Sequence, residues 1–203
     1  MTDQNFRRLS IAARWAAPAL ILLLAVPAAA QNRYRGQGQG PGAGVCAPAV
    51  PLSEAEAASV AFMREEEKLT RDVYQLLFEK WGLTTFANIA AAEQRHFEAV
   101  GALLARYGVA DPAENLPAGV FTNPDLTALY HQLVEKGTRS LADAVEVGIL
   151  IEKTDIADIE EALPLVSKLD VKRVYTNLLD GSLNHLEAFE TVLEILGLAP
   201  LAN

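Results

Sequence analysis

Glu93 and His96 have the spacing of two ligands of one metal ion. Residues three apart on a helix lie one turn apart on the same face, so this carboxylate and this imidazole can reach a common ion. The same step supplies ligands inside helical bundles that hold two metal ions among carboxylates. Alone the pair is weak evidence, because it recurs on many solvated helices. It indicates a metal site only if other segments supply further ligands.

Other segments of the chain carry suitable ligands. Mixed carboxylate and imidazole ligands suit iron and manganese, and also zinc. Cys46 is the only cysteine, so a thiolate site is excluded. Burying several carboxylates among apolar side chains is very costly unless a cation neutralises them. The candidate metal ligands are Glu67, Glu93, His96, Glu152, Asp155 and His185, with Glu66 as an alternative to Glu67.

Three adjacent glutamates, Glu65, Glu66 and Glu67, cannot all face one way on a helix. Glu67 falls in one apolar stripe and Glu66 in the neighbouring stripe, so either can point inward, while Glu65 is less favoured. The alternative interpretation is an ordinary charged helix face in solvent. For the two candidate histidines the alternative is hydrogen bonding near a core without metal. His131 is expected to be an ordinary surface residue.

The elements that must position these residues are helices. From a capping-box pattern at residues 53–56 onward, apolar residues recur at helical spacing, and no strand-like alternation lasts long enough to predict a strand. Gly181 is a point at which the last helix could be distorted. The predicted helices span about 53–81, 86–107, 125–136, 140–163 and 170–196.

The lengths of the connections predict the topology. Short loops make the first two long helices antiparallel, and likewise the last two. The roughly thirty residues between these hairpins are enough to cross the length of a bundle. Two hairpins joined by one long crossover form the ferritin-like arrangement. The predicted fold class is therefore all-α, a ferritin-like four-helix bundle whose long crossover carries a short helix.

Residues 1–30 have the pattern of a signal peptide. Arg7, Arg8 and Arg14 precede an apolar run at 15–26, and three alanines follow as a cleavage site. The run is short for a membrane span. We expect an exported protein, periplasmic or secreted, with no membrane span once the signal is removed. The adjacent arginines leave the twin-arginine route open beside the general one.

Residues 31–52 are predicted to be a flexible linker rich in Gly, Pro and Gln, which leaves 53–203 as the folded domain. The whole chain has a net charge of −9, and removing residues 1–30 makes it more negative. This charge argues against nucleic acid or an anionic membrane as partner, and is compatible with cations. Cys46 has no intrachain partner; it is either a thiol for an intermolecular disulfide or without a role.

The chain resembles rubrerythrins and bacterioferritins at residues 67–74, which are similar to the Glu-x-x-Ala-x-x-x-Tyr step of their first helix, with Thr70 in place of Ala. In those proteins the Glu is an iron ligand and the Tyr lies near the metal, so the resemblance implies that Tyr74 is a redox neighbour. Residues 63–74, 93–96 and 119–124 together resemble a closer group. That group is an uncharacterised ferritin-like domain family of bacteria and archaea, and the resemblance covers about 55–197.

The resemblance also implies roles for the ligands. Glu93 would bridge two metals, His96 would be a terminal imidazole, and Glu152 would be the second terminal carboxylate, with Asp155 one turn further on. Rubrerythrins repeat Glu-x-x-His on the last helix, but here Ser182 stands in place of the second bridging Glu while His185 fits. Asp155 could supply the missing oxygen. A two-metal site and a mononuclear or asymmetric site both remain open.

These features predict an iron-binding protein, with ferroxidase or peroxide-reducing activity as the enzymatic form of that function. The chain has no Cys-x-x-Cys pair, so turnover would need an external electron donor. The alternatives are a metal-buffering protein without turnover and a metal-free helical interaction module. Expected partners are metal ions and the electron donor, and a homodimer is a possible assembly.

Overall fold

The computed structural model describes residues 50–197. The described chain is all-helical, as predicted, and contains five α-helices, one 3-10 turn and no strand. The expected signal peptide, nearly all of the expected linker, and Cys46 lie outside the described residues. The elements are α2 (Glu54–Trp81), α3 (Thr84–Tyr107), α4 (Pro124–Gly137), α5 (Leu141–Ala162), η2 (Leu163–Leu165) and α6 (Leu169–Ile195).

The predicted helices agree with these bounds to within about two residues. The largest difference is at the start of α3, which begins at Thr84 and not at Phe86. The last helix runs through Gly181 without interruption, so the expected distortion is absent from it. Gly82 and Gly108 end α2 and α3 in the left-handed conformation, with φ of 68° and 66°, as helix-terminating glycines do.

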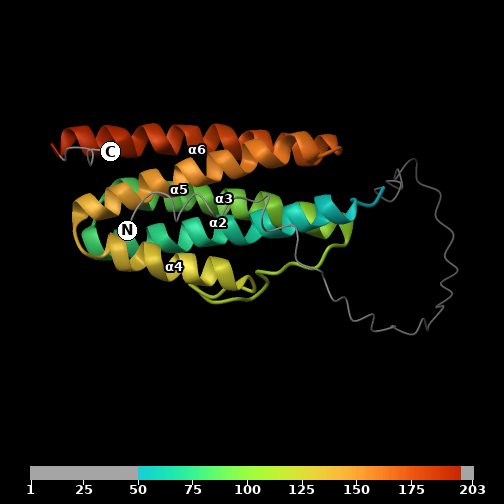
Figure 1. Cartoon of the computed structure of the whole chain (residues 1–203), viewed down its shortest axis with the longest axis horizontal. Coiled ribbons are helices and arrows are strands. Elements are labelled where there is room, and N and C mark those ends of the chain that lie inside the picture. Colours follow the sequence, from blue (N-terminus) through green and yellow to red (C-terminus); the bar gives the residue numbers. More distant parts are fainter. Residues whose placement is uncertain (1–49, 198–203) are drawn as a thin grey trace, which may run out of the picture.

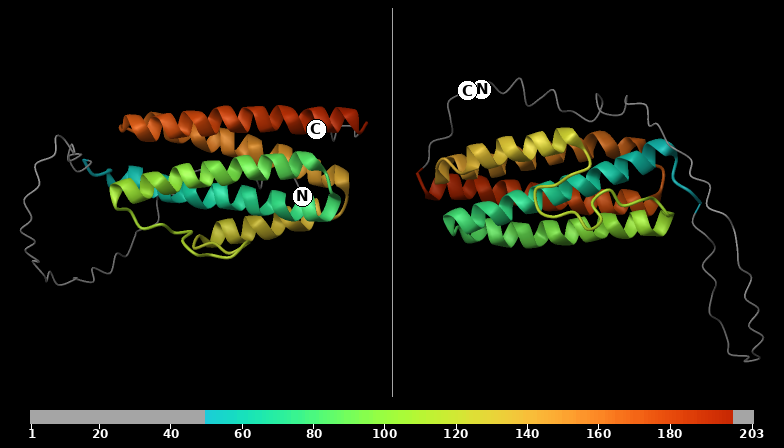
Figure 2. Two further views of the ribbon diagram at one scale, coloured as in Figure 1. Left: turned by 180° about the vertical axis from the view of Figure 1, so that it is seen from behind. Right: turned by 90° about the horizontal axis from the view of Figure 1, so that it is seen from below.

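The long helices form two antiparallel hairpins, α2 with α3 and α5 with α6 (Figure 1). The hairpins pack together through α3 on α6 and α2 on α5. The connection from α3 to α5 returns along the length of the molecule and contains α4, which lies against α2 and α5 (Figures 1 and 2). Among the described residues, no helix is long and apolar enough to cross a membrane.

The interior consists of two apolar clusters. One surrounds Tyr74, Phe86 and Phe189, and the other surrounds Met63 and Tyr175. Each long helix contributes to both clusters and carries buried polar residues between them: Glu67 on α2, Glu93 on α3, Glu152 on α5 and Ser182 on α6. The polar level between the clusters is where the fold brings the candidate ligands together.

Charged side chains of α2 hold the connection that leads to α4. Glu65 accepts hydrogen bonds from the backbone N–H groups of Thr122 and Asn123. Asp72 accepts one from Gly119 N at 2.9 Å, and Lys68 Nζ donates to Asp72 and to a carbonyl of the same connection. The interpretation of this stretch as a solvated charged face is therefore wrong. Glu65, Glu66 and Glu67 are all buried, and of the three it is Glu65 that accepts hydrogen bonds from this connection.

Glu56 joins the start of α2 to the loop before α6. It completes the capping box with Ser53 and also accepts hydrogen bonds from the backbone and side chain of Ser167. Burial raises the pKa of Glu56, but the hydrogen bonds from these two serines outweigh burial and lower the pKa from 4.5 to about 2. The ionised carboxylate is thus the form that the folded state stabilises.

We expect Glu56→Gln to lower the free energy of unfolding by about 2 kcal/mol at neutral pH, because it weakens hydrogen bonds to a charged group. The folded pKa is depressed, so this contribution is complete above the unfolded value of 4.5 and is lost as the pH falls from 4.5 toward 2. Denaturant unfolding at pH 7 and pH 3 measures it. Glu54→Gln, an exposed change in the same turn, is the control; an equal loss at both pH values for Glu56→Gln would contradict the explanation.

Candidate metal centre

Five side chains from four helices converge at the polar level between the two apolar clusters. The carboxylates of Glu67, Glu93 and Glu152 are at most 2% exposed, while the imidazoles of His96 and His185 are partly exposed. We call these five residues the candidate centre. Six residues were predicted as ligands, and the candidate centre contains all of them except Asp155.

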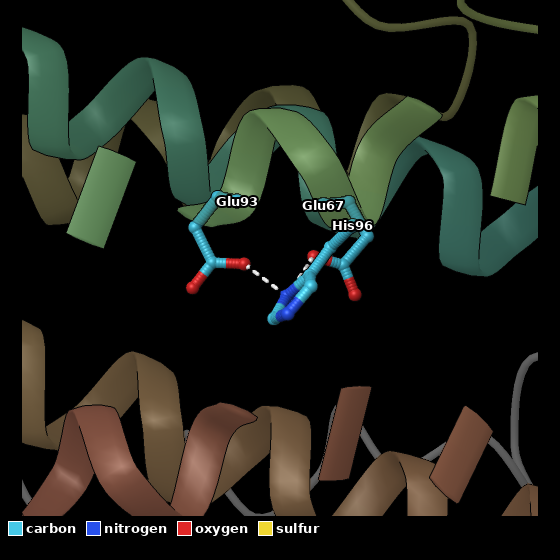
Figure 3. Close-up of side chains that lie close together, drawn as sticks. All are labelled: Glu67, Glu93 and His96. Atoms are coloured by element: carbon cyan, nitrogen blue, oxygen red, sulfur yellow. Dashed lines mark hydrogen bonds and ion pairs between the residues drawn. The ribbon is translucent and has the colours of Figure 1, made fainter. Parts of the chain in front are cut away.

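The candidate centre consists of two triads that share Glu93. The first is Glu67, Glu93 and His96 (Figure 3), and the second is Glu93, Glu152 and His185; within each, the ligand atoms lie within 4.8 Å of one another. Glu93 Oε2 lies 2.8 Å from His96 Nδ1, and Glu93 Oε1 lies 2.8 Å from His185 Nδ1. Each oxygen of one carboxylate therefore faces a different imidazole, as a carboxylate does when it bridges two ions.

The terminal carboxylates complete the triads at somewhat longer range. Glu67 Oε2 lies 3.5 Å from His96 Nδ1, and Glu152 Oε2 lies 3.6 Å from His185 Nδ1. Each triad then offers two carboxylates and one imidazole, a donor set that suits iron, manganese or zinc. The helices fix this geometry because Glu93 and His96 are one turn apart on α3 and the other ligands come from facing helices.

Three buried atoms of the candidate centre have no hydrogen-bond partner among the described residues: Glu67 Oε1, Glu152 Oε2 and His185 Nδ1. The short contact between His185 Nδ1 and Glu93 Oε1 lacks hydrogen-bond geometry. Buried polar atoms are nearly always paired, so unpaired atoms grouped at one point need an explanation. Coordination of cations would satisfy all three, and the donor set therefore fits a metal.

The carboxyl groups in and beside the candidate centre have shifted pKa values, because they are buried close to one another. Burial, followed by the charges of Asp155 and Glu93, raises the pKa of Glu67 well above its usual value. Burial likewise raises the pKa of Glu152 to about 7 and that of Asp155 to about 8. In Glu93 burial is outweighed by the two imidazoles, which lower the pKa to about 2. The buried surroundings thus favour the neutral forms of Glu67, Glu152 and Asp155 and the ionised form of Glu93.

Asp155 lies beside the candidate centre and outside both triads. Its Oδ2 is 2.5 Å from Ser182 Oγ, which is also 3.0 Å from the Leu178 carbonyl and can donate to one of them at a time. Ser182 therefore contacts Asp155, which belongs to neither triad. In this arrangement Glu93 alone connects the two triads.

The three adjacent glutamates have three different surroundings. Glu65 accepts hydrogen bonds from the connection to α4, Glu66 lines a small cavity under α4, and Glu67 belongs to the first triad. Of the two alternatives that the sequence left open, the structure places Glu67 and not Glu66 with the other ligands. His131 is exposed, as predicted.

Tyr74 lies directly behind Glu152. Its hydroxyl donates to Glu152 Oε1 at 2.6 Å, and its ring packs against Phe86 and Phe189. Burial, followed by the charge of Glu152, raises the pKa of Tyr74 well above its usual value, so the phenol keeps its proton and remains a donor. Tyr74 thus orients the terminal carboxylate of the second triad.

Gly181 is a feature of the site that the sequence prediction missed. A Cβ atom at this position would lie 2.5 Å from His96 Cε1 and 2.7 Å from His96 Nε2. The glycine lets α6 approach the imidazole on α3. The available signal was an isolated glycine within a helical pattern, which we interpreted as a point of distortion and which reflects close packing instead.

Comparison with known proteins identifies the domain but not its chemistry. Residues 56–200 match the family described as "Uncharacterized protein domain (DUF2202)". The chain belongs to this family. The expected similarity to an uncharacterised domain family is confirmed, whereas a ferritin-like relationship is not part of that description.

A relative of this DUF2202 domain is the uncharacterized protein MJ0754 of Methanocaldococcus jannaschii, 49% identical over 150 residues that cover 74% of this chain and 81% of the relative. The crystal structure of the hypothetical protein MJ0754 superposes with a TM-score of 0.72 at 48% identity, covering 74% of this chain and 86% of that one. A DUF305 fragment from Deinococcus radiodurans has a TM-score of 0.56 at 15% identity, covering 71% of this chain and 99% of the fragment, and shares the fold alone.

We expect Gly181→Ala to destabilise the DUF2202 domain, because the added methyl group collides with the His96 ring. In a His96→Ala background the same change should stabilise it by about 1 kcal/mol, the helix propensity of Ala over Gly. Unfolding of the four proteins in the double-mutant cycle measures this reversal of sign. Destabilisation of equal size in both backgrounds would show that Gly181 does not make room for His96.

If the second triad binds a metal ion, we expect Tyr74→Phe to weaken the affinity of that triad for the ion by about 10–100-fold. This is the usual effect of removing a residue that orients a metal ligand. The number of ions bound at saturation should stay unchanged, because all five ligands remain. Competition with a chelator measures the affinity. Tyr175→Phe is the matched control: it removes a buried hydroxyl whose 2.8 Å partner, Ser59, lies outside the candidate centre. Equal effects of the two variants would contradict the proposed role of Tyr74.

Proposed function

We propose that this protein is an exported, ferritin-like metal-binding protein whose candidate centre binds two iron ions bridged by Glu93. The observation that carries the proposal is the pair of 2.8 Å contacts from the two oxygens of Glu93 to two different imidazoles. Two helical hairpins, a lengthwise connection between them, and ligands from all four long helices support a ferritin-like arrangement. Export is proposed on the pattern of residues 1–30 alone.

Iron is the proposed metal on two grounds. The triads are rich in carboxylate and contain no thiolate, which favours iron or manganese and also allows zinc. The stretch that carries Glu67 and Tyr74 resembles the first helix of rubrerythrins and bacterioferritins, where the matching glutamate binds iron. Manganese and zinc are therefore the competing metals to test.

Iron in such a centre supplies one-electron redox chemistry toward dioxygen or peroxide, so a ferroxidase or peroxide-reducing activity is the enzymatic form of this proposal. Glu67 and Glu152 would each be a ligand of one ion. Tyr74 would orient Glu152 through its hydrogen bond and would be the redox-active side chain next to the site. The chain has one cysteine and so lacks the cysteine pairs that supply rubrerythrins with electrons. Repeated turnover would draw on an external electron donor.

The deciding experiment is metal analysis of the purified protein after anaerobic loading with Fe(II), and in parallel with Mn(II) and Zn(II). We expect two ions per chain and a higher melting temperature in the loaded protein, because an ion that binds only the folded state stabilises it. His96→Ala and His185→Ala should each remove one ion, and Glu93→Ala should remove both. His131→Ala, which alters an exposed histidine far from the triads in sequence, is the control.

The outcomes separate the three functional readings. Two ions with oxidation by dioxygen or peroxide would support the enzyme, and two ions without turnover would support a metal-buffering protein. Binding of a single ion, lost in either histidine variant, would indicate a mononuclear site instead of a bridged pair. No retained metal and an unchanged melting temperature would contradict metal binding and leave a helical interaction module.

A further inference from the structure

A cavity of about 20 Å³ lies between α2, α4 and α5, next to the candidate centre. Leu126, Leu129 and Leu133 of α4 form one wall. The opposite side includes Thr70 of α2 and Asp155 of α5. None of the five residues of the candidate centre lines it, so the cavity is a separate site.

Asp155 connects the cavity to the candidate centre. It lines the cavity, and its carboxylate contacts Ser182 of α6 on the side of the ligands. Glu66, which also lines the cavity, directly precedes the ligand Glu67. A small molecule in the cavity would therefore lie one side chain away from the metal ligands.

The lining favours an apolar occupant. Most of the surface that faces the cavity is apolar, although Glu66, Thr70, Thr154 and Asp155 also line it, and two of these polar residues have hydrogen-bond partners elsewhere. The Thr154 hydroxyl donates to the Leu150 carbonyl at 2.9 Å, and Asp155 Oδ2 is in contact with Ser182 Oγ. Buried polar ligands need hydrogen-bond partners, so a molecule that makes no hydrogen bonds suits this wall better than a polar one.

The size of the cavity limits the occupant further. A space of about 10–15 Å³ by the same measure holds one water molecule, so this cavity admits one molecule of similar size and excludes an organic substrate. A hydrated divalent cation is also excluded by size. Water and a diatomic gas both fit this volume, and the mostly apolar lining favours the gas.

We propose that the cavity under α4 is a dioxygen pocket that supplies the candidate centre from the side of Asp155. The use of the bound gas rests on the proposed function. Occupancy of the pocket does not, because none of the five residues of the candidate centre lines it and occupancy can be tested without metal. α4 then has a specific role: its leucine face closes the pocket over α2 and α5.

The test is NMR of the purified, metal-free protein with labelled Leu and Ile methyl groups, recorded under nitrogen and under increasing dioxygen pressure. Dioxygen is paramagnetic and increases the relaxation of methyl groups that it contacts. The methyl groups of Leu126, Leu129 and Leu133 should relax several-fold faster than those of Leu104 and Ile159, which are equally buried in the other apolar cluster. Equal enhancement in both sets would overturn the proposal.

Filling the pocket gives the second test. Leu129→Phe should abolish the excess relaxation at Leu126 and Leu133, and Leu104→Phe is the matched control in the other cluster. After iron loading, Leu129→Phe should slow oxidation by dioxygen several-fold at unchanged iron content. If Leu129→Phe does not fold, Leu129→Ala enlarges the pocket and should increase the relaxation instead. A change in neither variant would overturn the proposal.

Two outcomes separate this inference from the function on which it rests. A wild-type protein that binds no iron but shows dioxygen at these methyl groups would refute the proposed function and retain the pocket. A protein that binds two ions but shows no excess relaxation would retain the function and refute the pocket. A long-lived water contacting the same methyl groups, seen by transfer of magnetisation from water, would also refute it.

Discussion

The organisation of this domain depends on the burial of three glutamates at one level of an otherwise apolar interior. Carboxylates in such surroundings are stable only when charge or protons compensate them. Glu93 receives that compensation from two imidazoles, whereas burial raises the pKa of Glu67 and of Glu152 and so favours their protonated forms. The candidate centre is thus a group of buried donors that could hold a metal ion. The two apolar clusters on either side of this polar level hold the four long helices together.

Consecutive residues of the helix α2 contact three different parts of the molecule. Adjacent residues of a helix point about 100° apart, so three consecutive glutamates reach the connection to α4, the cavity and the first triad in turn. The buried ion pair of Lys68 and Asp72 on the same side also holds that connection. The connection in turn places α4 over α2 and α5. The candidate ligand on α2 and the placement of the leucine face of α4 therefore depend on the same helix.

Ser182 and its neighbours show how α6 packs beside the candidate centre. The serine hydroxyl contacts Asp155 and a carbonyl of its own helix. Gly181, the residue before it, provides the space that the His96 ring occupies. Residues 181–185 of α6 thus provide room for His96, a hydroxyl beside Asp155 and, at His185, a candidate ligand.

The amino-acid sequence by itself determined the helices, because periodicity, capping residues and glycine stops act over a few residues. It also indicated Glu93, His96 and His185, since spacing on one helix and the scarcity of histidine restrict the choice, while the resemblance to rubrerythrins implied Glu152. Tertiary packing decided what local spacing does not contain. It selected Glu67 over Glu66, placed Asp155 against Ser182 and outside the triads, and gave Gly181 its role against His96. Each of these depends on how helices distant in sequence are rotated and how closely they approach one another. A pattern within one helix contains no information about this.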